Sequence, residues 1–570
     1  MKKRQWLSMA MAAAVASTSA LGGLVVSAEG TAPEVNHDEL LTLEVYDVAA
    51  NFQGIQTGWY AKEIKDRFNI ELNIIAPQVS GDAASLYQTR CASGDLGDII
   101  ILDNADMQDC VDVGLIMDIS ADLPNYPNIM KYEEQINLFN TALNEILGNT
   151  GTYAIPAEMN SNGPTEYKAD TVYTMPRLAW DYYTEIGAPD MANLDDLLNV
   201  LKQIQDAHPT NEAGDKAYAL SLWPDWDNTS IENVNQITKW YGQEVNGSVM
   251  IGVDNSIVPL TDKEGAYYKM LNFLYKANQM GLVDPDSATQ DWNAACDKMR
   301  QKRVHLFWYN WQYGFWNSPE KGEARENYRG IPVGDMNFFQ ASDTYYGDGR
   351  VWGIGSNVSE DEKLRILEFF DWLCSPEGLT MQHIGQEGFI YTVNEDGTYT
   401  LTADGMIRFS SDLQVPEELG GGSWNDGNNQ VNQWLVAGIE MNPVTGETVS
   451  SDYWASFLEA NNTATNKEWS EKFGAANEVE YLKANGQLTP VPSVNLSLAI
   501  DDTDTALIRS QCGDLIKDTS WRAIFAADDA EFESLWDEMC ETLNGLGWEQ
   551  LVEFDTAKYQ PVIEARQAAE

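Results

Sequence analysis

Two short aromatic segments carry the residue types that a carbohydrate site needs. Residues 307–316 read FWYNWQYGFW, with seven aromatic side chains in ten positions, and Trp223-Pro224-Asp225-Trp226 places two indole rings beside a carboxylate. A sugar presents an apolar C–H face and a rim of hydroxyls, so its site requires flat rings edged by acids or amides. Packing into a hydrophobic core is the alternative for both segments.

Catalytic chemistry has no positive signal in the chain. The four histidines are scattered and exclude a HExxH zinc site, and no GxSxG, GxxxxGK[ST] or GxGxxG motif occurs. The 88 Asp and Glu residues make accidental carboxylate pairs common, so a glycosidase pair cannot be identified by spacing. We therefore predict no catalytic residue and no cofactor.

Metal and disulfide chemistry are equally weakly indicated. The acidic segments DNADMQD (103–109) and VDPDS (283–287) offer oxygen ligands, but neither follows the DxDxDG calcium loop, and we expect solvated loops there. No metal site is predicted. No CxxC pair occurs among the six cysteines, and we interpret them as free, mostly buried thiols. Their spacing does not identify disulfide partners, so disulfide pairing stays open. The cysteines are Cys91, Cys110, Cys296, Cys374, Cys512 and Cys540.

The N-terminal region has the pattern of an export signal. Lys2, Lys3 and Arg4 precede an apolar run that ends in the small residues Val26-Ser27-Ala28. The pattern predicts a signal peptide over 1–28 that is cleaved after Ala28, with an uncleaved membrane anchor as the alternative. No later segment approaches the roughly 20 apolar residues of a transmembrane helix, so the rest of the chain is expected outside the cytoplasm.

Length and charge indicate a two-lobed acidic protein. With 570 residues, 44% of them hydrophobic, the chain is long enough for two lobes with separate cores. Its formal net charge of −53 makes a surface that repels nucleic acid and anionic lipid. We expect no nucleic-acid partner.

Alternating strand and helix patterns begin the mature chain. Strands are expected at 41–48, 70–77 and 98–102; a helix with Tyr60, Ile64 and Phe68 on one face is expected after the first strand, and a helix over 81–95 after the second. This order implies a parallel sheet with ligands beyond the carboxyl ends of its strands, at Asn51, Phe52, Asp103 and Asn104. Farther along, helix caps are predicted at Asn193 and Ser359, and a hairpin at 389–402 around Asp396-Gly397.

Several longer segments resemble one known family. ASGDLGDIII (92–101), GTYAIPAEM (151–159), DKMRQKRVHLFWYNWQYGFW (297–316) and the C-terminal SLWDEMCETLNGLGWEQLVEFDTAKYQ (534–560) are similar to successive parts of the extracellular solute-binding proteins of ABC importers. The resemblance is to the long form of the carbohydrate-type group, family 1. No single motif is specific, but their order covers most of the chain.

The resemblance implies a fold, lobe boundaries and partners. The implied fold is α/β, two-lobed and periplasmic-binding-protein-like (type II), with the ligand cleft between the lobes. Lobe one would comprise 29–155 plus 350–390, and lobe two 157–348 plus 395–570. The implied protein is a monomer that binds an oligosaccharide and delivers it to ABC permease subunits. The signal region has no lipobox cysteine, so no lipid anchor is expected.

Two other functions stay open at this stage. The same fold would also suit a receptor for a peptide or another polar solute. A secreted glycoside hydrolase or a lectin would likewise be acidic and rich in aromatic residues. Scarce basic residues favour a neutral glycan over a uronate, although Arg177 or Arg350 could reverse this locally.

The expected ligand-binding residues combine strand-end position, resemblance and chemistry. The first half of FWYNWQYGFW alternates as a buried strand would, and its second half follows the strand end and is expected to face the cleft. Trp226 and Trp311 would stack on sugar rings from lobe two, while Asn51 and Asp103 would reach hydroxyls from lobe one. The full set of expected ligand-binding residues is Asn51, Phe52, Trp59, Asp103, Glu158, Trp226, Trp311, Tyr313, Trp352 and Trp424.

Overall fold

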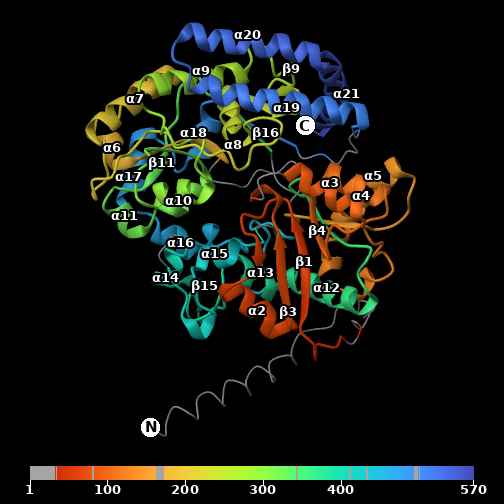
Figure 1. Cartoon of the computed structure of the whole chain (residues 1–570). Helices are drawn as coiled ribbons and strands as arrows, with labels where there is room; N and C mark the ends of the chain where they lie inside the picture. Colours follow the sequence, from red (N-terminus) through yellow and green to blue (C-terminus); the bar gives the residue numbers. More distant parts are fainter. Residues whose placement is uncertain are drawn as a thin grey trace.

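The computed structural model describes residues 33, 35–79, 83–161, 172–341, 345–409, 413–431, 434–492, 494, 499 and 501–569. The predicted signal peptide and its cleavage site lie outside these residues. Among the described residues, no helix has both the length and the apolar character needed to cross a membrane. The chain forms two lobes that lie one above the other in Figure 1.

The first lobe is built on a six-stranded sheet of order β2-β3-β1-β4-β13-β5. The central strand β1 pairs in parallel with β3 and β4, which confirms the parallel start that the sequence predicts. The strand β13 pairs antiparallel with both β4 and β5. The strands are β1 (Leu41–Asp47), β2 (Gly54–Ile55), β3 (Ile70–Ile75), β4 (Ile99–Asp103), β5 (Ala154–Pro156) and β13 (Arg350–Ile354).

Both faces of this sheet are covered, as the continuous apolar run in β4 predicts. Ile99 and Ile101 join one buried cluster, and the alternate residues Ile100 and Leu102 join the cluster on the other face. Helices α2 (Gly58–Phe68) and α12 (Glu360–Leu373) supply side chains to the first cluster. Helices α3 (Ala83–Ser93), α4 (Asn104–Asp112) and α5 (Glu133–Leu147) supply the second.

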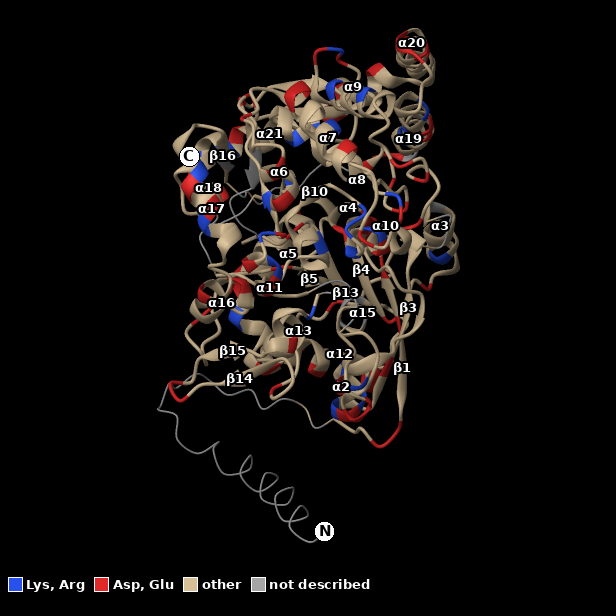
Figure 2. Ribbon diagram, turned by 90° about the vertical axis from the view of Figure 1, so that its left-hand side faces the viewer, with Lys and Arg blue, Asp and Glu red and all other residues tan. Residues whose placement is uncertain are grey.

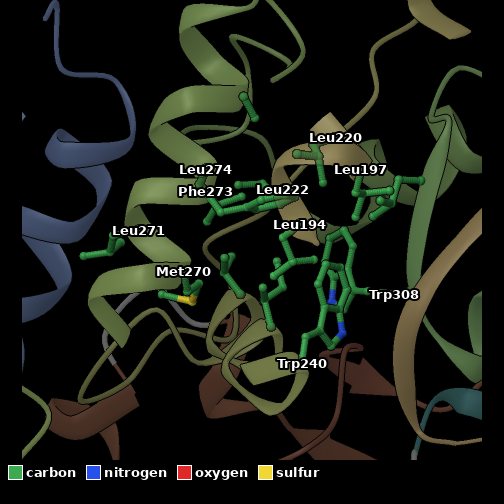
Figure 3. Packing of buried hydrophobic residues seen from close by; sticks show 14 of the residues in the cluster. Leu194, Leu197, Leu220, Leu222, Trp240, Met270, Leu271, Phe273, Leu274 and Trp308 are labelled. Atoms are coloured by element: carbon green, nitrogen blue, oxygen red, sulfur yellow. The ribbon is translucent and has the colours of Figure 1, made fainter. Parts of the chain in front are cut away.

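The second lobe has a larger, mainly helical core around the three-stranded sheet β10-β6-β11. Figure 3 shows Trp240 and Trp308 near Leu194 and Leu197, in the same core as side chains of α9. The strands are β6 (Thr174–Ala179), β10 (Leu306–Tyr309) and β11 (Tyr328–Gly330). Helices of this lobe include α6 (Trp180–Glu185), α7 (Leu194–Ala207), α9 (Ala266–Gln279), α10 (Trp292–Arg300), α19 (Thr503–Ile524), α20 (Asp529–Leu546) and α21 (Trp548–Ala569).

Short elements complete both lobes. Three further small sheets are β7-β8-β9 (Gln243–Asn246, Val249–Gly252, Ile257–Pro259), β12-β16 (Phe338–Ala341, Leu488–Val491) and the predicted hairpin β14-β15 (Tyr391–Val393, Tyr399–Leu401). The expected caps are confirmed: Asn193 accepts from the Asp196 N–H, and Ser359 forms a capping box with Glu362. The remaining α-helices are α8 (Glu232–Asn235), α11 (Pro319–Glu323), α13 (Pro376–His383), α14 (Ala403–Met406), α15 (Trp424–Asn429), α16 (Ala455–Ala460), α17 (Ala464–Phe473) and α18 (Glu478–Ala484).

The buried clusters differ in one respect from the expected division into lobes. Buried side chains from Tyr391 to Trp454 pack into the core of lobe one, whereas the sequence places everything from 395 onward in lobe two. From Trp469 onward, buried side chains again belong to the core cluster of the second lobe. The region from about 405 to 480 is rich in Gly, Asn and Asp and has little periodicity, so its sequence does not indicate which core it joins. The exact lobe boundaries stay a prediction.

Candidate functional site

A cross-lobe contact joins the strand ends of lobe one to the aromatic loop of lobe two. Asn51 follows β1, and its Oδ1 accepts hydrogen bonds from Gln78 Nε2 at 2.6 Å and from Trp226 Nε1 at 3.1 Å. Phe52, the next residue after Asn51, has a half-buried side chain, and so does Trp226. Asn51 and Trp226, both expected ligand residues, are therefore brought together at the boundary between the lobes.

Behind Trp226 lies a tryptophan cluster, formed by Trp223, Trp226, Trp292, Trp308 and Trp311. Trp223 and Trp308 are fully buried and stacked, with ring centroids 5.2 Å apart and planes 19° apart. Trp226, Trp292 and Trp311 are half-buried, and their centroids are 4.6 to 6.1 Å from one another. The buried Trp223 contacts Trp226 and Trp292, with ring centroids 5.3 and 4.8 Å away, and Trp308 stacks on Trp223.

The segment FWYNWQYGFW is buried in its first half and partly exposed in its second, and the expectation that the second half faces the cleft stays a prediction. Its first residues form β10, which is buried along its whole length. A 3-10 helix, η5 (Asn310–Phe315), follows directly. The Gln312 side chain fixes this turn, since its Oε1 accepts from the backbone N–H groups of Trp308 and Tyr309 at 2.7 and 2.9 Å. Trp311 then stacks on Tyr309, with ring centroids 4.7 Å apart, and its side chain is partly exposed.

An acidic edge lies where β4 ends and β13 begins. Arg350 stands between Asp103 and Asp348, with nitrogen–oxygen distances of 3.5 and 3.3 Å. The Asp103 side chain is 62% exposed, yet its pKa is raised, because the surrounding protein limits its hydration, while Arg350 opposes the shift. Acidic residues outnumber basic ones on both lobes (Figure 2).

Two further carboxyl groups, on Asp47 and Glu158, follow strands of the same sheet: Asp47 ends β1, and Glu158 comes shortly after β5. Burial raises the pKa of Asp47, which ends β1, to about 7, although the Ala49 N–H donates to its Oδ1 at 2.9 Å. Burial, reinforced by Asp348, raises the pKa of Glu158 to about 8. Glu158 also has a backbone φ of 58°, a left-handed conformation that non-glycine residues rarely adopt and that often marks functional sites.

Three expected ligand residues instead belong to the core of lobe one. Trp59 and Trp424 are both fully buried and stack on each other, with centroids 5.7 Å apart, and Trp59 Nε1 donates to the Trp424 carbonyl. Trp352 is 3% exposed and packs edge-on against Phe370. A ring enclosed in this way has no free face for a sugar, so the expectation is wrong for these three residues in this conformation.

Tyr313 serves a buried ion-pair network in lobe two. Its hydroxyl donates to Glu478 Oε1 at 2.7 Å, and its ring lies under the Arg177 guanidinium. Arg177 is fully buried and donates to the backbone carbonyls of Val172 and Trp308. The polar end of Tyr313 therefore points into the lobe, and Arg177 is not available to a ligand.

Trp292 is a candidate that the sequence pattern did not reveal. It begins α10 after the capping residue Asp291, and its backbone N–H donates to Asp225 Oδ2 at 2.7 Å. This bond joins α10 to the Trp223–Trp226 loop. A solitary tryptophan in a polar segment gives no local signal of this role, because its position depends on how α10 packs against η5.

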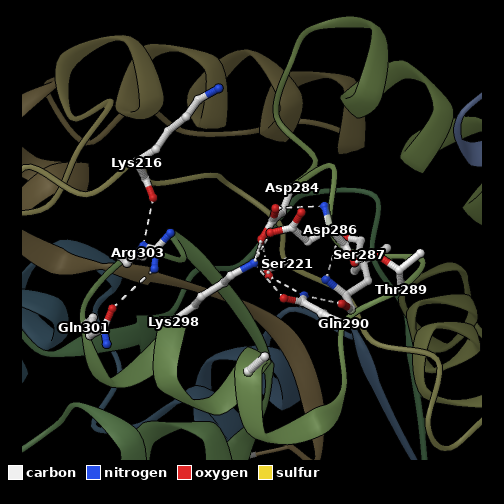
Figure 4. Close-up of polar contacts among 12 residues, drawn as sticks. Lys216, Ser221, Asp284, Asp286, Ser287, Thr289, Gln290, Lys298, Gln301 and Arg303 are labelled. Atoms are coloured by element: carbon white, nitrogen blue, oxygen red, sulfur yellow. Dashed lines mark hydrogen bonds and ion pairs between the residues drawn. The ribbon is translucent and has the colours of Figure 1, made fainter.

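The acidic segment 283–287 surrounds an ammonium group (Figure 4). Lys298 Nζ lies 2.6 Å from Asp284 Oδ2, 3.0 Å from Asp286 Oδ2 and 2.7 Å from Gln290 Oε1. The Asp284 side chain is 1% exposed and the Lys298 side chain 12%. The lysine thus supplies the positive charge among these oxygens, and the described residues contain no cluster of acidic, His or Cys side chains suited to a metal ion.

Comparisons with known proteins agree with the two-lobed architecture. The family model of bacterial extracellular solute-binding proteins matches residues 54–380. No curated protein matches the chain significantly. Among solved structures, the Streptococcus pneumoniae ABC-transporter substrate-binding protein FusA in complex with kestose matches with a TM-score of 0.59 and 15% identity, covering 93% of this chain and all of that one.

Two other solved structures match over a similar extent. The alginate-binding protein AlgQ2 without calcium ion gives a TM-score of 0.59 and 14% identity, covering 92% of this chain and 98% of that one. An HMO-binding solute-binding protein from Bifidobacterium longum infantis gives a TM-score of 0.53 and 15% identity, covering 92% of this chain and 99% of that one. At these identities the likeness concerns the fold, which is the two-lobed binding-protein fold with its cleft between the lobes.

Proposed function

Since the chain belongs to the bacterial extracellular solute-binding proteins, we propose that it captures an oligosaccharide between its two lobes and presents it to the permease of an ABC importer. The observation that carries the choice of ligand is the tryptophan cluster at the lobe boundary. Its members Trp226, Trp292 and Trp311 are partly exposed, and Trp226 donates to Asn51 of the opposite lobe at 3.1 Å.

The chemistry of this boundary suits a sugar. Indole faces cover the apolar C–H face of a pyranose or furanose ring, while carboxylates and amides accept hydrogen bonds from its hydroxyls. Trp226, Trp292 and Trp311 supply the faces from lobe two, and Asn51 and Asp103 supply oxygen atoms from lobe one. A ligand that touches both lobes favours the closed arrangement, because closure adds contacts that the open arrangement lacks.

The solved structures of similar fold support a saccharide over other solutes. Their described ligands include kestose, alginate and HMO. A peptide or another polar solute is the principal alternative, because one fold can host different sites. The family consists of binding proteins, and we propose that this chain likewise has no enzymatic activity.

A thermal-shift screen of neutral oligosaccharides against peptides tests the proposal. A ligand at 100 times its dissociation constant adds about 2.7 kcal/mol to the free energy of unfolding, which gives a clear rise in Tm. Stabilisation by a saccharide that is recovered unchanged after long incubation supports a receptor. Shortening of the saccharide would indicate a hydrolase, and stabilisation by peptides alone would contradict the oligosaccharide proposal.

Location and assembly are further parts of the proposal. We propose an exported monomer whose signal peptide is cleaved after Ala28, so that the mature chain begins at Glu29. The basic start and the small residues before the cleavage point support this. Intact-mass measurement of the secreted protein tests the cleavage site. Light scattering after gel filtration tests whether the protein is a monomer.

A further inference from the structure

A polar cavity of about 150 Å³ lies in lobe two beside the short helix α8. It has room for several water molecules or for a large part of one sugar ring. Its lining comes from α8, from the 3-10 helix η4 (Gln236–Tyr241) and from β7, and includes Glu232, Asn235, Gln236, Thr238, Lys239 and Glu244. All of these side chains can exchange hydrogen bonds with hydroxyl groups.

Two hydrogen bonds join the wall of this cavity to the tryptophan cluster. Asn233 of α8 donates from Nδ2 to the Trp223 carbonyl at 3.2 Å, and its own carbonyl accepts from the Tyr309 hydroxyl at 3.2 Å. Tyr309 is also the ring on which Trp311 stacks. The cavity and the partly exposed indoles therefore belong to one connected part of lobe two.

Tyr173 is an exposed ring that contacts both the cluster and the cavity wall. It packs edge-on against Tyr309, with ring centroids 5.2 Å apart, and the residue is 40% exposed. On its other side, the ammonium group of Lys239 lies 5.8 Å from the Tyr173 centroid. Trp311 and Tyr173 thus pack against the same buried tyrosine, and Tyr173 continues the aromatic surface toward the cavity.

The cavity lining contains a buried acceptor that needs a donor. Among the described residues, Gln236 Oε1 is buried and has no hydrogen-bond partner, whereas Gln236 Nε2 donates to Asn235 Oδ1 at 3.2 Å. A buried polar atom without a partner costs free energy, and most such atoms in folded proteins are satisfied. The hydroxyl group of a sugar would supply the missing donor.

Resting on the proposed function, we propose that the ligand site extends from Trp311 over Tyr173 into this cavity, which takes a second, hydroxyl-bearing unit of the oligosaccharide. The rings of Tyr309 and Tyr173 separate Trp311 from the cavity wall, so a sugar stacked on Trp311 does not fill the cavity as well. The ligand class is therefore an oligosaccharide of several units, and its affinity depends on its length.

Size ladders of oligosaccharides test this inference on the full mature protein. Fructo-, manno-, xylo- and malto-oligosaccharides, each from the monosaccharide to the hexasaccharide, are titrated by calorimetry. Within a ladder that binds, we expect affinity to rise at least about tenfold from the shortest binding member to the member that reaches the cavity. The added unit gains hydrogen bonds that are each worth roughly two- to twelvefold in affinity.

Two variants remove parts of the path into the cavity. Gln236→Leu removes the acceptor and should weaken the long members roughly two- to twelvefold while leaving the shortest binding member unchanged. Tyr173→Ala removes the ring beside the cavity and should weaken the same long members. Gln203→Leu makes the first change on the exposed face of α7 and is the matched control, which should leave every member unchanged. Melting curves verify that each variant is folded.

Equal weakening of short and long members in Gln236→Leu, or no weakening of any member, would overturn the inference. A wild-type affinity that does not depend on ligand length would overturn it too. The proposed function would survive these results, because the tryptophan cluster would still bind the glycan. If no oligosaccharide of these ladders or of the thermal-shift screen binds, the proposed function itself fails.

Discussion

Removing the Trp226 ring tests the tryptophan cluster as a sugar platform. In Trp226→Ala, one indole face of about 100 Å² is lost to the ligand, and at roughly 25 cal/mol per Å² this weakens binding by up to about 2.5 kcal/mol. Because about 1.4 kcal/mol corresponds to a factor of ten, the dissociation constant should rise by up to about sixtyfold. The cross-lobe hydrogen bond to Asn51 is lost in the same variant.

Trp226→Phe separates these two effects. The phenyl ring keeps much of the stacking face but has no N–H for Asn51, so we expect a loss of about 0.5–1.5 kcal/mol, or roughly two- to twelvefold in affinity. Trp548→Phe, at the start of α21, is the control for a general loss of packing: it should lower Tm without changing affinity, because Trp548 is buried and donates to Thr261 within lobe two.

Calorimetry with the glycan found in the screen measures affinity, and melting curves of the ligand-free proteins measure stability. Trp226 is half-buried, so its truncation should cost less than the about 3–5 kcal/mol typical of a core tryptophan. Unchanged affinity together with a core-sized loss of stability in Trp226→Ala would refute the reasoning, since the ring would then serve packing alone.

Three further outcomes follow from the structure. Lys298→Met should destabilise the protein by about 3–5 kcal/mol, because it leaves Asp284 buried without its ion partner, and adding Asp284→Asn should restore part of the loss in denaturant melts. Asp47 holds a proton more tightly in the folded state, so stability should fall by up to about 4 kcal/mol as pH rises from 4 through 7, and Asp47→Asn should flatten this slope. Trp311→Ala should weaken glycan binding by up to about sixtyfold, as Trp226→Ala does, whereas an equal affinity would place Trp311 outside the site.

Local residue patterns were sufficient to predict the strands that begin the first lobe. The β-rich run 41–48 predicts β1, and the unbroken apolar run before Asp103 predicts a strand covered on both faces, as β4 is. The position of Asn51 and Asp103 beyond these strands then follows from the parallel order.

Long-range packing explains the residues that the sequence misplaced. Trp59 and Trp424 stack although they are 365 positions apart, and nothing near either residue signals the other. Trp292 joins the tryptophan cluster only because α10 packs against η5 and its N–H reaches Asp225. A tryptophan at a helix start looks the same in the sequence whether it faces a core, a neighbouring lobe or water.

The central claim is that one oligosaccharide touches both lobes at the boundary formed by Asn51 and the tryptophan cluster. Hydrogen–deuterium exchange with and without the bound glycan tests it most directly, because slow exchange reports which backbone segments become protected. We predict protection of residues 49–56 in lobe one together with 223–232 and 310–315 in lobe two. Protection confined to one lobe, or found only away from these three segments, would contradict the claim.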